Sequence, residues 1–136
     1  MTIFFGSFGQ DQALGYVTNK VTSTENLVYR LFATNVTPSH TDTFGTYTEA
    51  TGGGYSSIAL TGASWSISAT GGVATASYAQ QTYTFTGALT TNATIYGYFV
   101  TGATNTTSEY LAEAFTSFTP AANGDNIKLT PTITAT

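Results

Sequence analysis

Threonine is the residue that most constrains what this chain can fold into, because it occupies thirty of the 136 positions. Its β-branched side chain loses rotamer freedom in a helix and fits well on a pleated strand. Tyrosine and phenylalanine, nine of each, add to this preference, whereas the helix-favouring residues lysine, glutamate and leucine are scarce. The composition therefore predicts an all-β protein.

Hydrophobic alternation places several strands in this sequence. Residues 26–32 alternate so that Leu27, Tyr29 and Leu31 share one face, and in residues 81–86 Tyr83 and Phe85 alternate with threonine. Such period-two patterning is typical of antiparallel sheets with one wet face. Residues 109–118 fit either a strand or a helix, and their β-rich neighbours favour a strand.

Turn residues separate the remaining segments. Asn123-Gly124 predicts a hairpin turn, and Pro131 places the last strand, residues 126–134, at a sheet edge or a bulge. About eight short strands at intervals of roughly 8–12 residues predict a single antiparallel β-sandwich or jelly-roll domain spanning residues 1–136. Ten residues are the predicted core: Leu27, Tyr29, Leu31, Trp65, Ile67, Tyr83, Phe85, Ile95, Phe99 and Ile127.

Charge is scarce, at 7% of residues, and the net charge is −4. Only Lys20, Arg30 and Lys128 are positive, too few to neutralise a phosphate backbone or to form a polybasic membrane patch. We therefore expect no nucleic-acid or membrane partner. The first nine residues lack the basic start of a signal peptide. Cysteine is absent, which excludes disulfides and thiolate metal sites.

The sequence offers little for catalysis. The single histidine, His40, lies beside Asp42 in a polar loop, and no nucleophile-elbow motif occurs. Glu109 and Glu113 form the only close acidic pair in the sequence and would share a face on either a helix or a strand, so a glycosidase-like pair is conceivable, although solvated charges explain them more simply. We predict a protein that is not an enzyme and has no metal or cofactor.

Five stretches resemble small virion proteins of tailed bacteriophages. They are EATGGGY at residues 49–55, LTGASW at 60–65, YTFTG at 83–87 with IYGYFV at 95–100, and NIKLTPTI at 126–133. The resemblance implies a structural role in the virion, after assembly in the host cytoplasm. The leading expectation is a capsid decoration, or cement, protein that binds and stabilises the shell of major capsid protein. Its partner would be the major capsid protein or another virion protein, and it would be a homo-oligomer within the assembly.

A tail or fibre module that binds host-surface glycans is the alternative, because tyrosine and tryptophan can stack on sugar rings. Against it, Trp65 alternates with serine and is more simply a core residue. The two functions differ in where the protein would lie on the particle.

The N-terminus concentrates apolar side chains. Ile3, Phe4, Phe5 and Phe8 lie within nine residues and are flanked by Gly6 and Gly9. Two interpretations stay open. Either the segment is an ordinary first strand with Ile3 and Phe5 in the core, or part of it is a partner-binding surface on a neighbouring subunit.

Overall fold

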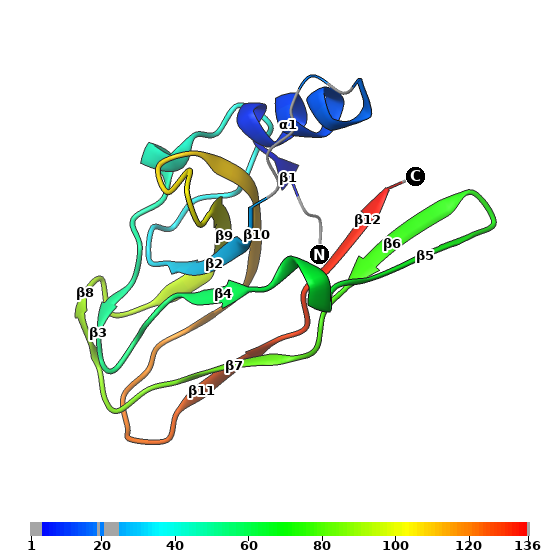
Figure 1. Ribbon diagram of the computed structural model, residues 1–136. Helices are drawn as coiled ribbons and strands as arrows, with labels where there is room; N and C mark the ends of the chain where they lie inside the picture. The colour runs from blue at the N-terminus through cyan, green and yellow to red at the C-terminus, as the bar shows by residue number, and fades with distance from the viewer. Residues whose placement is uncertain (1–3, 19, 21–24, 136) are drawn as a thin grey trace.

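The computed structural model describes residues 4–18, 20 and 25–135, which form a mostly β protein with one helix (Figure 1). The secondary-structure elements follow in chain order: β1 (Phe4–Phe5), α1 (Ser7–Val17), β2 (Leu27–Phe32), the 3-10 turn η1 (Phe44–Thr46), β3 (Thr51–Gly52), β4 (Ile58–Leu60), the 3-10 turn η2 (Gly62–Ser64), β5 (Ser66–Thr70), β6 (Val73–Ser77), β7 (Gln81–Thr84), β8 (Leu89–Thr91), β9 (Ile95–Gly102), β10 (Glu109–Phe118), β11 (Asn126–Leu129) and β12 (Thr132–Ala135). The predicted all-β, sandwich-like architecture is confirmed.

A five-stranded antiparallel sheet in the order β1-β10-β9-β2-β4 forms the centre of the molecule. Because side chains alternate along each strand, the sheet has two faces. On one face, Tyr29, Leu31 and Val100 pack with residues of the β7–β11 pair and of β8, and with Phe85 directly after β7. On the other face, Phe32 and Phe99 pack against the segment 33–50. Each face therefore has its own apolar core. We call the core on the first face the main core and that on the other face the second core.

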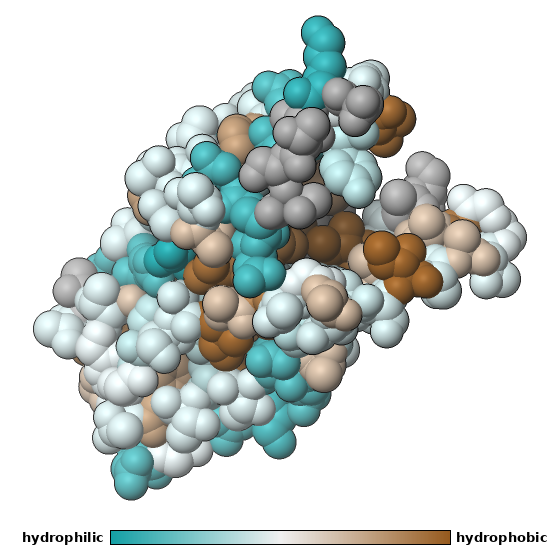
Figure 2. Space-filling model, in the orientation of Figure 1, coloured by the Kyte–Doolittle hydropathy of each residue, from teal (hydrophilic) through white to brown (hydrophobic). Residues whose placement is uncertain are grey.

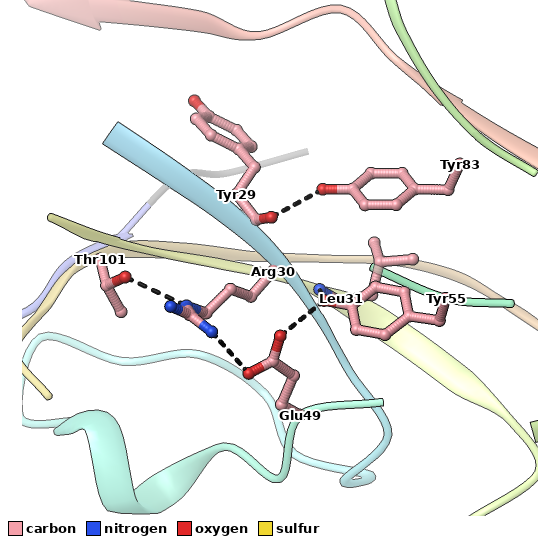
Figure 3. Close-up of polar contacts among 7 residues, drawn as sticks. All are labelled: Tyr29, Arg30, Leu31, Glu49, Tyr55, Tyr83 and Thr101. Carbon is pink, nitrogen blue, oxygen red and sulfur yellow. Dashed lines mark hydrogen bonds and ion pairs between the residues drawn. The ribbon is translucent and has the colours of Figure 1, made fainter. Parts of the chain in front are cut away.

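A network of polar contacts fixes segment 33–50 to the second face (Figure 3). The Arg30 guanidinium lies 2.8 Å from the Glu49 carboxylate and also donates to the Thr101 hydroxyl on β9. The Tyr55 hydroxyl donates to Glu49 and accepts a hydrogen bond from the Leu31 amide. These bonds give the charged and polar groups the hydrogen-bond partners that the neighbouring apolar side chains cannot provide.

Several predicted elements are confirmed, with corrections at the end of the chain. Residues 27–32 and 109–118 are strands. Gly124 has φ 96°, as a turn requires, but the predicted hairpin is wrong, because β11 pairs with β7 and not with β10. Pro131 divides the predicted last strand into β11 and β12, which belong to different sheets.

Helix α1 was not expected from the composition. It is stabilised by packing rather than by helix propensity, because the Phe8 ring contacts Tyr110 edge-on at 5.0 Å between centroids. Gly9 lies so close to β10 that an added Cβ would be 2.0 Å from the Tyr110 carbonyl oxygen. Tertiary contact thus overrides local preference here.

The core prediction is confirmed for seven residues, which are buried: Tyr29, Leu31, Tyr83, Phe85, Ile95, Phe99 and Ile127. Leu27 and Trp65 are half-buried and pack against the same core. The prediction is wrong for Ile67, whose side chain is 78% exposed. Ile67 belongs to β5, in a part of the fold that extends away from the main sheet.

That part is a three-stranded sheet in the order β12-β6-β5, which we call the arm (Figure 1). β5 and β6 form a hairpin in which Thr70 pairs with Val73 across Gly71-Gly72. Both glycines have positive φ, 60° and 83°, the conformation that a tight two-residue hairpin turn needs. The hairpin projects beyond the body of the molecule.

Candidate functional site: the arm and its groove

One face of the arm carries only apolar side chains among its described residues. The register pairs Ile67 with Ala76 and Ala76 with Ile133, and it pairs Ala69 with Ala74. Directly opposed residues in antiparallel strands point to the same face, as do residues two apart in one strand. These five side chains therefore form one continuous surface, which we call the apolar face of the arm.

The opposite face of the arm is made of hydroxyl-bearing side chains with one exception, Val73. Its members are Ser66, Ser68, Thr70, Val73, Thr75, Ser77, Thr132 and Thr134. None of the residues in β5, β6 and β12 is charged. The arm is thus an amphipathic sheet whose wet face is neutral and whose dry face consists of isoleucine and alanine.

Aromatic packing anchors the base of the arm to the body. The Trp65 and Tyr78 rings meet edge-on, with centroids 5.3 Å apart, and both pack against the main core. The Tyr78 amide donates to the Pro131 carbonyl, which ties β6 to the start of β12. Ile133 also contacts the core, whereas β5 is exposed over its whole length. The apolar face is therefore supported at its base, and toward its tip no described residue covers it.

A groove of about 810 Å³ separates the apolar face of the arm from the body and α1. The arm side of the groove is lined by Ile67, Ala76 and Ile133. The rest includes Tyr16 of α1, Tyr110 of β10 and Trp65 directly before β5. Figure 2 shows hydrophobic side chains gathered in the notch between the arm and the rest of the molecule. α1 adds exposed apolar groups nearby, since Leu14 and Val17 are 67% and 84% exposed. This concentration of uncovered apolar surface is typical of an interaction site.

Glu25 is the charged residue that lines the groove. Its carboxylate accepts hydrogen bonds from the Thr104 and Asn105 amides, the Asn105 side chain and the Tyr110 hydroxyl. Burial raises the pKa of Glu25, but these bonds outweigh it and lower the pKa to about 2. The pKa of Tyr110 is raised to about 12, first by burial and second by the hydrogen bond that its hydroxyl donates to Glu25. Glu25 is thus engaged within the chain, and the groove offers mainly apolar contacts.

The structure places the predicted N-terminal partner-binding residues as follows. Ile3 lies outside the described residues, and Phe4 pairs through its backbone with Ala112 of β10. Phe5 is half-buried against the main core, and Phe8 is half-buried against Tyr110. Phe5 and Phe8 therefore stabilise the chain's own fold, and the uncovered apolar surface lies on the arm and the outer side of α1.

The polar candidates are also dispersed. Asp42 accepts hydrogen bonds from Ser39 and the Tyr47 hydroxyl, and Nδ1 of His40 lies 3.2 Å from Nε2 of Gln10. The expectation that Glu109 and Glu113 share a face is wrong. Glu109 pairs with Thr101 but Glu113 pairs with Tyr98, three positions away, because a β-bulge interrupts the strand between them.

The described residues contain no group of three or more histidine, cysteine, aspartate or glutamate side chains placed to hold a metal ion. Among the described elements, no helix is long and apolar enough to cross a membrane. No protein-family model, curated protein or solved structure matches the chain. The site must therefore be interpreted from its own geometry.

The sequence did contain a signal for this site. Residues 66–77 alternate serine or threonine with isoleucine or alanine around a Gly-Gly turn, except at Val73, and include no charge. Alternation shows which side chains share a face but not whether another layer covers that face. The same pattern therefore predicted a core position for Ile67.

Proposed function

We propose that this protein is a structural component of a virion, a capsid decoration protein that packs the apolar face of its arm on a subunit of the major capsid protein. The observation that carries the proposal is the uncovered apolar face on a projecting sheet with no charged residue. The resemblance to phage virion proteins supplies the class of partner.

The chemistry of the arm argues for a protein partner. A polyanion such as nucleic acid needs cations, and none lies on the arm. Isoleucine and alanine side chains on one face of a sheet suit a flat protein surface, because they offer apolar contact without any charge to desolvate. An interface of this kind depends little on salt. Neutral threonine and serine surfaces elsewhere suit a component that acts outside the cell.

The location of the protein on phage particles tests the proposal directly. Antibody labelling of particles that carry the chain should decorate the head in many copies. Quantitative mass spectrometry of the same particles should give a copy number that scales with the number of capsid subunits. Labelling confined to the tail tip would overturn the capsid assignment.

A pair of arm variants tests the surface itself. Ile67→Thr keeps a β-branched residue but places a hydroxyl on the apolar face, and Val73→Thr makes the same kind of change on the polar face. Both positions are exposed, so both variants should fold. Binding to particles that lack the protein should fall at least tenfold for Ile67→Thr and stay within twofold for Val73→Thr. Equal binding by both variants would remove the arm from the interface.

One observation favours the second candidate, a tail or fibre module that binds host glycans. The groove brings together Tyr16, 65% exposed, with Trp65 and Tyr110, and aromatic rings can stack on sugars. An array of bacterial surface polysaccharides would reveal such binding. Tyr16→Ala should then abolish it, whereas Ile67→Thr should weaken attachment to the capsid.

A further inference from the structure

The N-terminal segment, residues 4–17, docks on β10 through a few close contacts. Phe5 pairs with Leu111, and the Gly6 amide donates to the Tyr110 carbonyl over 3.2 Å. The first turn of α1 then packs on the Tyr110 backbone at Gly9. The remainder of α1 extends outward, where Leu14, Tyr16 and Val17 are exposed. The start of the segment therefore determines whether the whole helix stays in place.

A buried carboxyl group lies directly beneath this contact. Glu109 is 3% exposed, and its Oε2 has no hydrogen-bond partner among the described residues. Oε2 lies against Gly6, where an added Cβ would be 1.8 Å away. The N-cap of α1 is Gly6, which has no side chain to mediate a bond between the two. A carboxyl in this position is tolerated when neutral and costly when ionised.

The charge that acts most on Glu109, that of Asp42, opposes its ionisation. Asp42 faces it from segment 33–50; burial acts to raise the pKa of Asp42, but the hydrogen bonds that it accepts from Tyr47 and Ser39 outweigh burial and lower it. Other groups on the packed elements are Tyr47 on the same segment, His40 beside Gln10 and Phe5, Asp11 on α1, and Arg30, which bonds Thr101 and Glu49. Arg30 is thus already neutralised by Glu49.

We propose that Glu109 is a pH-sensitive latch for residues 4–17: its neutral form lets β1 and α1 dock on β10, and its ionisation weakens that docking. Burial first, and the Asp42 charge second, raise the pKa of Glu109 to about 7. When the segment leaves β10, the carboxyl becomes solvated and its pKa returns toward the ordinary value of about 4.3. The docked state therefore binds the proton more tightly than the undocked state. Docking is strongest below about 4.3 and weakens as pH rises from about 4.3 through 7.

This inference goes beyond the proposed function and is tested on the isolated protein, so either can fail without the other. Undocking of α1 would remove one wall of the groove, because Gln12 and Tyr16 of α1 line it. An 11-residue helix is marginal alone in water, so undocking should expose its amides to exchange. Hydrogen-exchange protection of α1, corrected for intrinsic rates, therefore measures docking.

Linkage with these two pKa values predicts that protection of the α1 amides falls about tenfold between pH 6 and pH 8. In Glu109→Gln, which cannot ionise, protection should change less than twofold over this range. Glu113→Gln is the matched control, since it removes a buried carboxyl from the opposite face of the same strand, and it should retain the tenfold fall. The same fall in Glu109→Gln, or none in the unmodified protein, would overturn the latch.

A second measurement needs no variant and covers the case in which Glu109→Gln does not fold. The chain has four glutamates, so the ¹³C resonance of the Glu109 carboxyl can be assigned and followed by NMR during a pH titration. A midpoint near 7 supports the latch. A midpoint near 4.3 shows that the carboxyl is solvated in the folded protein and overturns it.

Discussion

Glu109 and Glu113 lie four positions apart on β10, yet their carboxyl groups lie on opposite faces of the central sheet. The bulge between Glu109 and Leu111 turns Glu109 toward Gly6 and Asp42. Glu113 faces the main core, where it accepts a 2.6 Å hydrogen bond from the Tyr98 hydroxyl. The two carboxyl groups therefore cannot act together on one substrate, and each has a separate environment.

Replacing Phe99 by alanine should destabilise the protein by about 3–5 kcal/mol, because the ring is fully buried and stacks on Tyr47. Ile67→Ala, at an exposed position, should change the free energy of unfolding by less than about 0.5 kcal/mol. Urea unfolding measures both. A small effect at Phe99 would show that the second core contributes little to stability.

Gly97→Ala should destabilise the protein by about 1–3 kcal/mol or more through overpacking. A Cβ at Gly97 would lie 2.2 Å from the Glu113 carbonyl oxygen and 2.5 Å from the Phe32 ring. Gly87→Ala is the control, because a Cβ there meets nothing within 4 Å. Thermal unfolding should lower Tm for the first variant and leave it nearly unchanged for the second. Equal Tm values would mean that β9 and β10 can separate at little cost.

Tyr55→Phe should cost about 1–3 kcal/mol, because it leaves the Leu31 amide and one Glu49 oxygen without the Tyr55 hydroxyl (Figure 3). Tyr96→Phe removes a hydroxyl from another half-buried tyrosine, for which no such network exists among the described residues. Chemical denaturation of the two variants separates a loss of hydrogen bonds from the loss of a hydroxyl in general. Identical midpoints would show that the hydrogen bonds of the Tyr55 hydroxyl make no measurable contribution to the stability of the fold.

Glu25→Gln should flatten the acid side of the stability profile. The folded-state pKa of about 2 lies below the usual value of 4.5, so the stabilisation by ionised Glu25 is complete above 4.5 and is lost as pH falls toward 2. Because the group is mostly solvated, the effect should be modest. Differential scanning calorimetry between pH 2 and 7 measures it. A variant whose Tm falls as steeply as that of the unmodified protein would contradict the role of Glu25.

Deleting residues 2–8 tests what remains of the N-terminal interface hypothesis. The deletion removes β1 and the start of α1, so we expect the rest of the helix to unfold and the Phe8 contact with Tyr110 to be lost. Near-UV circular dichroism reports the tyrosine environments, and particle binding reports assembly. A well-folded variant that no longer binds particles would show that the N-terminal segment contacts the partner protein.

The sequence by itself determined the strands and their faces. Period-two alternation placed β2 and β7 and assigned Tyr29, Leu31 and Phe85 to buried positions, and the β-rich neighbours of residues 109–118 favoured a strand for β10. These signals are local, because β-propensity and alternation depend on each strand's own residues. The phage resemblance added an expectation of function, which these local patterns cannot supply.

Only the tertiary structure decided which faces are covered and where each strand pairs. Ile67 and Phe85 occupy equivalent positions in alternating segments, yet one is exposed on the arm and the other is fully buried. The bulge that separates Glu109 from Glu113 and the packing of Gly9 on Tyr110 depend on strands distant in sequence. Burial is a property of what packs opposite a side chain, and in this chain that partner is set by long-range pairing.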